Sequence, residues 1–351
     1  MTDNLKIILT ACGCPGASTL IRMLKEVPDR DITIIGTDTD EEAVGRFLVD
    51  DFYQVPHGQS DEYIPAMLSI VETEEPDVLF PESTFEVHPL AEHREKFESL
   101  GTEVVVSDPE AIQTANNKFE MYQAISEQTD VDLPEYSLVQ SHEEFRAAAD
   151  ELGYPDEPIV FKPPVGKGSR GVRIIDPEVD RRELLLEEKP NSLYIDMEEV
   201  EQIFADKPFP ELLVMEYVGG EEETADSLCL RGDELLTSFK TVEDARWGVI
   251  VRGELVERPE LLTMTQKILD AIPLSYCVNL QFIDGKLIEI NPRVSTFIYQ
   301  RDFLQAYLAI QLALDEVSNE DVRSYRDDID YGRRMVRYMD QVFHTDGNRL
   351  L

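Results

Sequence analysis

The chain has 351 residues, 42% of them hydrophobic, which is enough for two or three globular domains with substantial cores. Its formal net charge is -40, from 72 acidic and 32 basic residues, and this argues against nucleic-acid binding through a broad basic face. The acidic residues are spread along the whole chain, so we interpret them as a hydrated surface adapted to high salt and not as a disordered tail. Clusters of the scarce lysines and arginines are therefore more informative than single acidic residues.

The cysteines predict no zinc site, and the hydropathy of the chain predicts no membrane span. The four cysteines form no CxxC pair, and the five histidines lie far from zinc-ligand spacing. No basic segment followed by an apolar core opens the chain, and no apolar run is as long as a membrane span. We therefore expect a soluble, cytoplasmic protein.

The first 110 residues alternate between short apolar runs and amphipathic segments. This alternation is typical of a parallel α/β sheet, so we predict a Rossmann-like domain. Strands are expected at 6–11, 32–36, 78–81 and 104–106, and helices near 19–26, 61–74 and 87–100.

A glycine-rich turn follows the first expected strand, and Asp38 ends the second. This pairing is found in dinucleotide-binding domains, where the acidic residue holds a ribose. The spacing here is Gly13-x-x-Gly16, however, and not GxGxxG. We favour a tight strand-to-helix turn in a domain that binds no nucleotide, with dinucleotide binding as the alternative.

The next segment combines glycines with basic residues. A helix containing Lys118 precedes an apolar strand at 159–163, which includes Lys162, and a glycine-rich loop at 165–172 joins it to a strand at 173–175. Such a hairpin tip can fold over phosphates, which its backbone N–H groups and cations would bind. No helix follows and GxxxxGK[ST] is absent, so this is not a Walker A loop.

Farther along, an apolar strand at 212–218 leads into an acidic hinge at 219–226 and a strand at 227–230. An open hinge of this kind can offer its backbone to an adenine edge, and a nearby carboxylate can accept hydrogen bonds from ribose hydroxyls.

Residues 281–293 form a strand-turn-strand pattern that ends in Glu289, Asn291 and Arg293. Alternate residues of a strand share one face, so these side chains are expected to point the same way. Carboxylate and amide oxygens suit magnesium, which usually arrives with nucleotide phosphates, and the arginine could clamp an anion. The segment predicts phosphoryl transfer.

These elements, in this order, resemble the ATP-grasp superfamily of ligases, and most closely the modules of the carbamoyl phosphate synthase large subunit and their single-copy relatives. The resemblance covers nearly the whole chain. It implies α/β and α+β architecture: a Rossmann-like domain at 1–110, a small ATP-grasp lobe at 111–210 and a large lobe at 211–351. Because the chain has a single copy of the module, we do not expect a complete carbamoyl phosphate synthase.

The resemblance also implies site residues. It places nucleotide phosphates on Lys118, Lys162, Gly168, Ser169 and Arg170, the adenine on the backbone of Glu216, Tyr217 and Val218, and the ribose on Glu222. It places magnesium on Gln281, Glu289 and Asn291, and Arg293 beside the transferred phosphoryl group. Arg246, together with Lys240 and Arg252, is a candidate for binding a substrate carboxylate.

The activity implied is an ATP-dependent carbon–nitrogen ligase that needs magnesium, or manganese in its place. It would join a small carboxylate to an amine through an acyl phosphate, without nucleic-acid or membrane partners, and a homodimer is left open. The alternatives are an ATP-grasp phosphotransferase that forms no carbon–nitrogen bond and a non-catalytic nucleotide or dinucleotide sensor.

The turn inside residues 281–293 tests the role of Gln281. A two-residue type I′ turn at Asp284-Gly285 would pair Gln281 with Ile288, facing away from Glu289. A three-residue loop closed by Phe282 and Lys286 would move the register by one. We predict the three-residue loop, because only this register was expected to place Gln281 and Glu289 on one face.

Overall fold

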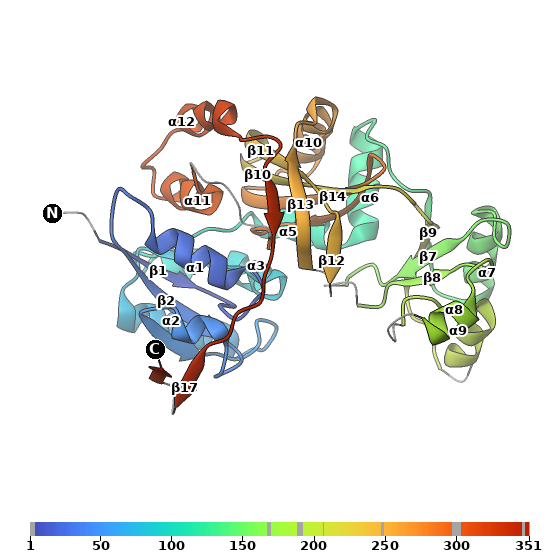
Figure 1. Ribbon diagram of the computed structural model, residues 1–351, viewed down its shortest axis with the longest axis horizontal. Helices are drawn as coiled ribbons and strands as arrows, with labels where there is room; N and C mark the ends of the chain where they lie inside the picture. The colour runs from blue at the N-terminus through green and yellow to red at the C-terminus, as the bar shows by residue number, and fades with distance from the viewer. Residues whose placement is uncertain are drawn as a thin grey trace.

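The computed structural model describes residues 4–166, 170–187, 192–205, 207–246, 249–296, 303–345 and 348–350. Gly168 and Ser169, two of the residues expected at the phosphate loop, lie outside the described residues. Three main sheets follow one another along the chain and define an N-terminal domain, a small lobe and a large lobe (Figure 1).

The N-terminal domain is built on a parallel sheet in the order β3-β2-β1-β4-β5. This is the strand order of Rossmann-type sheets, and it confirms the predicted fold class. The strands are β1 (Leu5–Leu9), β2 (Ile32–Asp38), β3 (Asp51–Gln54), β4 (Val78–Phe80) and β5 (Glu103–Val104). The helices are α1 (Ala17–Lys25), α2 (Tyr63–Glu74), α3 (Thr84–Glu92), α4 (Arg94–Glu98) and the 3-10 turn η1 (Val44–Phe47).

The small lobe is an antiparallel sheet in the order β6-β9-β7-β8. Its strands are β6 (Tyr136–Val139), β7 (Ile159–Lys162), β8 (Arg173–Ile175) and β9 (Leu212–Glu216), and its helices are α7 (His142–Glu151), α8 (Arg181–Leu186) and α9 (Met197–Phe204). Two further helices, α5 (Pro109–Asn116) and α6 (Lys118–Gln128), lead to it from the N-terminal domain.

The large lobe is an antiparallel sheet in the order β12-β13-β11-β10-β14-β15, with β16 beside β13. Its strands are β10 (Glu222–Leu230), β11 (Asp233–Thr241), β12 (Asp244–Arg246), β13 (Val249–Val256), β14 (Tyr276–Ile283), β15 (Lys286–Asn291) and β16 (Arg334–Val336). Its helices are α10 (Pro259–Ala271), α11 (Gln305–Ala313), α12 (Asn319–Ser324) and the 3-10 turn η2 (Tyr325–Asp328). A hairpin of β17 (Phe343–Thr345) and β18 (Asn348–Leu350) follows.

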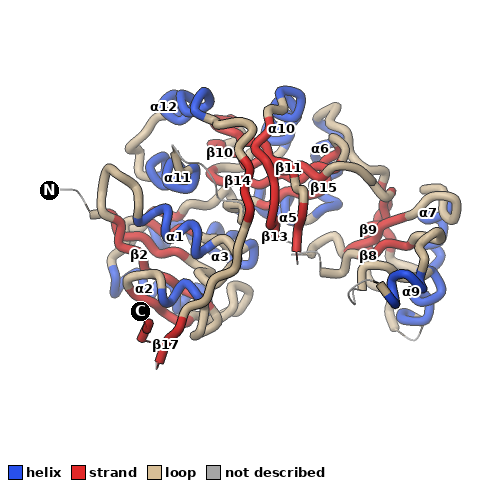
Figure 2. Tube along the Cα trace, in the orientation of Figure 1, coloured by secondary structure: helices blue, strands red, loops and turns tan. Residues whose placement is uncertain are grey.

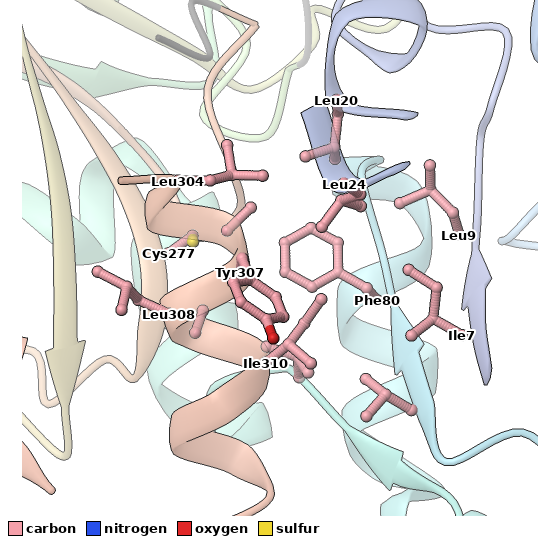
Figure 3. Packing of buried hydrophobic residues seen from close by; sticks show 14 of the residues in the cluster. Ile7, Leu9, Leu20, Leu24, Phe80, Cys277, Leu304, Tyr307, Leu308 and Ile310 are labelled. Carbon is pink, nitrogen blue, oxygen red and sulfur yellow. The ribbon is translucent and has the colours of Figure 1, made fainter. Parts of the chain in front are cut away.

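Helix α11 joins the large lobe to the N-terminal domain. It is apolar nearly all round, and residues such as Tyr307 and Ile310 are buried. One hydrophobic cluster runs from Ile7 and Phe80 of the N-terminal sheet through α11 to Cys277 of the large-lobe sheet (Figure 3). Because one core is shared, the N-terminal domain and the large lobe are held together by burial of apolar surface.

The small lobe has a core of its own. Its sheet packs on α7 and α9 through residues such as Phe145, Phe161 and Val200, and it lies at one end of the molecule (Figure 2). Residues 217–221 connect it to the large lobe. Helix α6, by contrast, packs its Met121 and Ile125 into the large-lobe core. The expected lobe boundaries near 110 and 210 stay a prediction.

Strand β10 begins at Glu222, although the sequence predicted a strand only from residue 227. The acidic run at 221–223 suggested an open loop, but Glu222 and Glu223 pair with β14 and Glu223 also forms an ion pair with Arg258. The hinge is therefore shorter than expected. None of the described helices is long and apolar enough to cross a bilayer.

Candidate active site

The hairpin of β14 and β15 has a two-residue turn, so the predicted three-residue loop is wrong. Ile283 pairs with Lys286, and Asp284 and Gly285 both have positive φ, at 48° and 78°. These are the angles of a type I′ turn, which matches the right-handed twist of the strands and which Asp-Gly favours.

Gln281 nevertheless lies opposite Glu289, as predicted. Phe282 pairs with Leu287 and Gln281 with Glu289, so Ile288 is an extra residue in β15. This β-bulge moves the register by one residue inside the strand and not at the turn. The two-residue turn therefore does not remove Gln281 from the face of Glu289.

The bulge is supported from helix α6. The hydroxyl of Tyr122 donates a hydrogen bond of 2.9 Å to the carbonyl of Ile288, the residue that the bulge leaves without a cross-strand partner. Tyr122 is fully buried, so this bond satisfies a carbonyl that water would otherwise have to reach.

We expect Tyr122→Phe to lower the free energy of unfolding by about 1–2 kcal/mol, because the buried carbonyl of Ile288 loses its donor. The shifted register should also loosen, which would weaken magnesium-dependent nucleotide binding. Urea unfolding and calorimetry would measure both effects. Tyr136→Phe is the matched control, because Tyr136 packs on Tyr122 with ring centroids 5.0 Å apart and its hydroxyl bonds none of the described residues. Equal losses in the two variants would contradict the role of Tyr122.

Four amide and carboxylate side chains form a patch on one face of the hairpin. Asn279 lies opposite Asn291, and Gln281 lies opposite Glu289. Gln281, Glu289 and Asn291 supply one anionic and two neutral oxygens, which fits a magnesium ion that keeps phosphate and water ligands better than a metal held by protein alone. The described residues include no cluster of three histidine, cysteine or acidic side chains that could hold a metal.

Asn279, which was not among the predicted site residues, orients the side chains of Gln281 and Asn291 in this patch. Its Oδ1 accepts hydrogen bonds from Gln281 Nε2 at 3.5 Å and from Asn291 Nδ2 at 3.4 Å. Its own Nδ2 donates to Asp226 at 2.8 Å and to Thr224. With its nitrogen turned toward Asn279, Gln281 has its oxygen available for a metal. Asn291 Oδ1 also accepts a hydrogen bond from Arg293 at 3.3 Å, which leaves one of its two lone pairs for a metal.

Two lysines from different parts of the chain lie beside Glu289. Lys118, the first residue of α6, lies 3.5 Å from Glu289 Oε1 and donates to the carbonyl of Gly166 at 3.2 Å. Lys162, the last residue of β7, is buried, and its pKa is lowered to about 7 by burial and by the charge of Lys118, while Glu289 opposes the shift. A bound polyphosphate would compensate both charges.

We expect ATP binding to take up about one proton near pH 8 and much less near pH 6, because phosphate oxygens favour the charged form of Lys162. In the free protein the lowered pKa means that the unfolded state binds more protons, so this lysine makes stability rise with pH above about 7. Calorimetry in buffers of different ionisation enthalpy measures the uptake. Lys162→Arg, which stays charged, is the control, and equal uptake in both proteins would refute the assignment.

Arg293 connects the hairpin to the N-terminal domain. Its guanidinium donates to Asn291 Oδ1 at 3.3 Å, to the carbonyl of Val294 at 2.8 Å and, across the domain boundary, to Thr84 Oγ1 at 3.1 Å. Burial lowers the pKa of this guanidinium. The group keeps its positive charge, because the ordinary pKa of arginine lies far above neutral pH. The guanidinium is therefore a fixed cation beside the predicted metal ligands.

The predicted adenine and ribose residues lie at the hinge between the lobes. Glu216 ends β9 and forms an ion pair with Lys286, while Tyr217 is exposed and Val218 half-buried. Glu222 begins β10, and burial together with nearby Glu289 raises the pKa of its carboxyl group. These residues thus border the patch, and their roles in nucleotide binding stay predictions.

Three other candidates are placed differently. Arg246 is exposed on β12 and lies 3.6 Å from Asp244, which also accepts from Arg252. Lys240 is buried and forms an ion pair with Asp226, so it supports the network under Asn279. Arg170 is exposed at the end of the phosphate loop. No described contact joins Arg246 to the patch, and its role stays a prediction.

A cavity of about 700 Å³ opens next to this region, between the N-terminal domain and the start of α6. Thr84, which accepts from Arg293, lies in its wall, together with Asn117 and Val165 near the phosphate loop. The cavity therefore offers space for a substrate between Arg293 and the N-terminal domain.

Two sequence families match the chain. Residues 208–335 match the family described as ATP-grasp in the biosynthetic pathway with Ter operon, and residues 7–105 match the PylC-like N-terminal domain. Among curated proteins, none matches the chain significantly in sequence.

Several solved structures share the fold. One is the T882A variant of Rhizobium etli pyruvate carboxylase with acetyl coenzyme A, which is 19% identical to this chain with a TM-score of 0.65. The match covers 95% of this chain and 30% of the carboxylase, so this chain spans under a third of the carboxylase's length. N5-carboxyaminoimidazole synthetase of Staphylococcus aureus with ADP is 13% identical with a TM-score of 0.64, over 91% and 79%. The biotin carboxylase domain dimer of Hydrogenobacter thermophilus 2-oxoglutarate carboxylase, with MgADP, ADP and bicarbonate, is 19% identical with a TM-score of 0.65, over 94% and 73%. At such identities the likeness establishes the fold alone.

The Rossmann-type domain and the two lobes that follow it are the architecture of an ATP-grasp fold. The family matches assign residues 208–335 to an ATP-grasp domain and residues 7–105 to a PylC-like N-terminal domain. The particular closeness to carbamoyl phosphate synthase has only loose support, because the neighbours named above are biotin-dependent carboxylases and a carboxyaminoimidazole synthetase.

Proposed function

We propose that the protein is an ATP- and magnesium-dependent ligase that joins a carboxylate to an amine through an acyl phosphate. The main support is the meeting of Lys118 and Lys162 at Glu289, within 3.5 Å in the case of Lys118. Two buried or nearly buried cations, one carboxylate and two oriented amides suit a metal-bound polyphosphate, and no such group is needed by a merely structural fold.

Each residue has a role in this proposal. Lys118 and Lys162 bind phosphate oxygens, and Gln281, Glu289 and Asn291 hold the metal. The metal would offset charge on the β- and γ-phosphate oxygens when it is bound. Arg293 stabilises the negative charge of the transferring phosphoryl group, and positioning and charge, not acid–base chemistry, lower most of the barrier.

The reaction runs in two steps. The substrate carboxylate attacks the γ-phosphorus, and the bond to ADP breaks as the acyl phosphate forms. The amine nitrogen then attacks the acyl carbon, and the carbon–oxygen bond to phosphate breaks as the amide forms. One neighbour named above, the biotin carboxylase domain of Hydrogenobacter thermophilus, was solved with MgADP, ADP and bicarbonate, and the presence of a nucleotide and a small acid in one structure of this fold supports the choice of reaction class.

An ADP-release screen tests the proposal. A library of carboxylates is supplied with MgATP and hydroxylamine, which traps any acyl phosphate as a hydroxamate, so that the acid is found before the amine is known. Amines then replace hydroxylamine. The assay is run at molar salt, because the -40 net charge is expected to self-repel without screening.

The outcomes distinguish the three candidate functions. ADP release that needs both an acid and an amine supports the ligase. ADP release with one acceptor and a stable phosphorylated product means a phosphotransferase. Tight binding of MgATP or of NAD by calorimetry, without ADP release from any acceptor, means a sensor.

A further inference from the structure

The cavity beside Arg293 is large, and several parts of the chain contribute to its wall. Its volume of about 700 Å³ lies within the range of roughly 300–1,000 Å³ in which proteins bind drug-sized ligands. Helices α2 and α3 of the N-terminal domain line it, together with the end of α5, the start of α6 and Val165 of the phosphate loop. A small acid such as bicarbonate would leave most of this space unfilled.

The N-terminal domain contributes apolar side chains to this wall. On α2, Ile64 and Leu68 are four residues apart, and on α3, Phe85 and Pro89 are four residues apart. Residues at this spacing share one face of a helix. Because both pairs line the cavity, two helices present apolar faces to it.

The loop after β3 packs tightly against the start of α3. A Cβ atom at Gly58 would lie 2.6 Å from the carbonyl oxygen of Phe85, closer than these atoms can approach, so only glycine fits there. The ring of His57 packs on the ring of Phe85, with centroids 4.8 Å apart. These contacts fix Phe85, so this part of the wall is formed before any ligand binds.

Val165 brings an exposed apolar side chain to the same cavity. It lines the cavity, and it is 58% exposed. Lys118 holds the backbone on both sides of it: its N–H donates to the carbonyl of Pro164 at 2.9 Å, and its ammonium donates to the carbonyl of Gly166 at 3.2 Å. Val165 is thus held in place while much of its apolar surface faces solvent. A ligand with an apolar body would cover that surface, which is favourable.

The charged side chains of the wall are paired or exposed. Glu92 lies 3.4 Å from His88 Nδ1, and Glu120 accepts a hydrogen bond from Asn117 at 2.9 Å. The other acidic residue and the lysine of the wall are exposed to solvent, namely Asp61 and Lys96. The described wall thus holds no buried, unpaired charge that calls for an ionic group on the body of the ligand.

Thr84 connects this cavity to Arg293. It lines the cavity, and its hydroxyl accepts a hydrogen bond from the guanidinium at 3.1 Å. A ligand whose body lies in the cavity can therefore place a terminal carboxylate at Arg293, where the acyl phosphate is proposed to form.

We propose that the acid substrate is a carboxylate with a large apolar body, aryl or branched alkyl, which lies in this cavity against Phe85 and Val165. This inference rests on the proposed ligase function and names the class of acid. It separates this chain from the biotin carboxylase domain named above, whose structure contains bicarbonate. Burial of apolar surface grows with the area covered, so this wall selects larger acids over smaller ones.

Calorimetry with a non-hydrolysable ATP analogue and magnesium tests the site without requiring turnover. The probes are 3-phenylpropanoate and 4-methylpentanoate, with acetate as the carboxylate that has no large apolar body. We expect at least one of the larger acids to bind the wild type about tenfold more tightly than acetate. Val165→Ala should reduce this preference about threefold, and Phe85→Ala should nearly abolish it, because each change removes apolar surface from the wall.

Val44→Ala is the matched control. It shortens another exposed valine, on η1 and outside the cavity wall, so the preference for larger acids should persist. Phe85→Leu keeps an apolar side chain and should recover part of the preference, and thermal unfolding shows whether the Phe85 variants are folded. The proposal is overturned if the wild type binds the larger acids no more tightly than acetate, or if Val165→Ala keeps the full preference.

The ADP-release screen gives a separate result. If a larger acid binds with this preference but no acid supports ADP release, the ligase function is overturned and the binding site for the acid stands. If bicarbonate or acetate supports ADP release as well as the larger acids do, the ligase function stands and the assignment of the acid is overturned.

Discussion

Arg293→Ala is expected to lower turnover by about 10³-fold while the dissociation constant of MgATP rises by less than about tenfold. The guanidinium contacts Asn291, Val294 and Thr84, and no described contact joins it to Lys118 or Lys162. It therefore acts on the charge that develops at the transferred group more than on the bound nucleotide. ADP release in single-turnover and steady-state assays measures the first effect, and calorimetry measures the second.

Two control variants test whether the loss of turnover is specific to the Arg293 guanidinium. Arg293→Lys keeps the charge but cannot reproduce three directed hydrogen bonds, so we expect an intermediate turnover. Arg22→Ala removes an exposed arginine from α1 and should behave as the wild type. Thermal unfolding shows whether the contact with Thr84 is needed to hold the domains together. Near-normal turnover in a folded Arg293→Ala protein would defeat the assignment.

The hairpin shows which part of a site is local in sequence. The types and the alternation of residues 281–293 were enough to predict one face bearing Glu289 and Asn291. The turn was predicted wrongly, because the needed register shift was assigned to the loop and not to the strand. The bulge at Ile288 depends on Tyr122, which lies 166 positions away in the chain, and no local pattern contains that hydrogen bond.

Other parts of the candidate site differ in how far they were predictable. Asn279 stands two residues before Gln281 and alternates with it, so the strand pattern could have identified it. Thr84 follows an apolar strand, which is a signal for the carboxyl end of a parallel sheet. Its hydrogen bond with Arg293, however, depends on the packing of α11 between two domains, and no local sequence pattern contains that packing.

Glu289→Gln is expected to weaken MgATP binding by about a hundredfold, because the one carboxylate of the patch is lost. A second effect follows from the lysines. Glu289 pairs with Lys118 at 3.5 Å and favours the charged form of Lys162, so its removal should lower the pKa of Lys162 further below about 7. The variant should thus lose both metal affinity and the cation that meets the phosphates at neutral pH.

The two effects are separable by comparing nucleotide with and without metal. In the wild type, calorimetry should show that magnesium strengthens ADP binding, whereas in Glu289→Gln the ratio of the two affinities should approach one. Glu254→Gln is the matched control, because Glu254 lies on β13 of the same sheet and pairs with Arg334 away from the patch. If magnesium strengthens ADP binding equally in all three proteins, Glu289 is not a metal ligand, and the site must then be sought elsewhere on the large-lobe sheet.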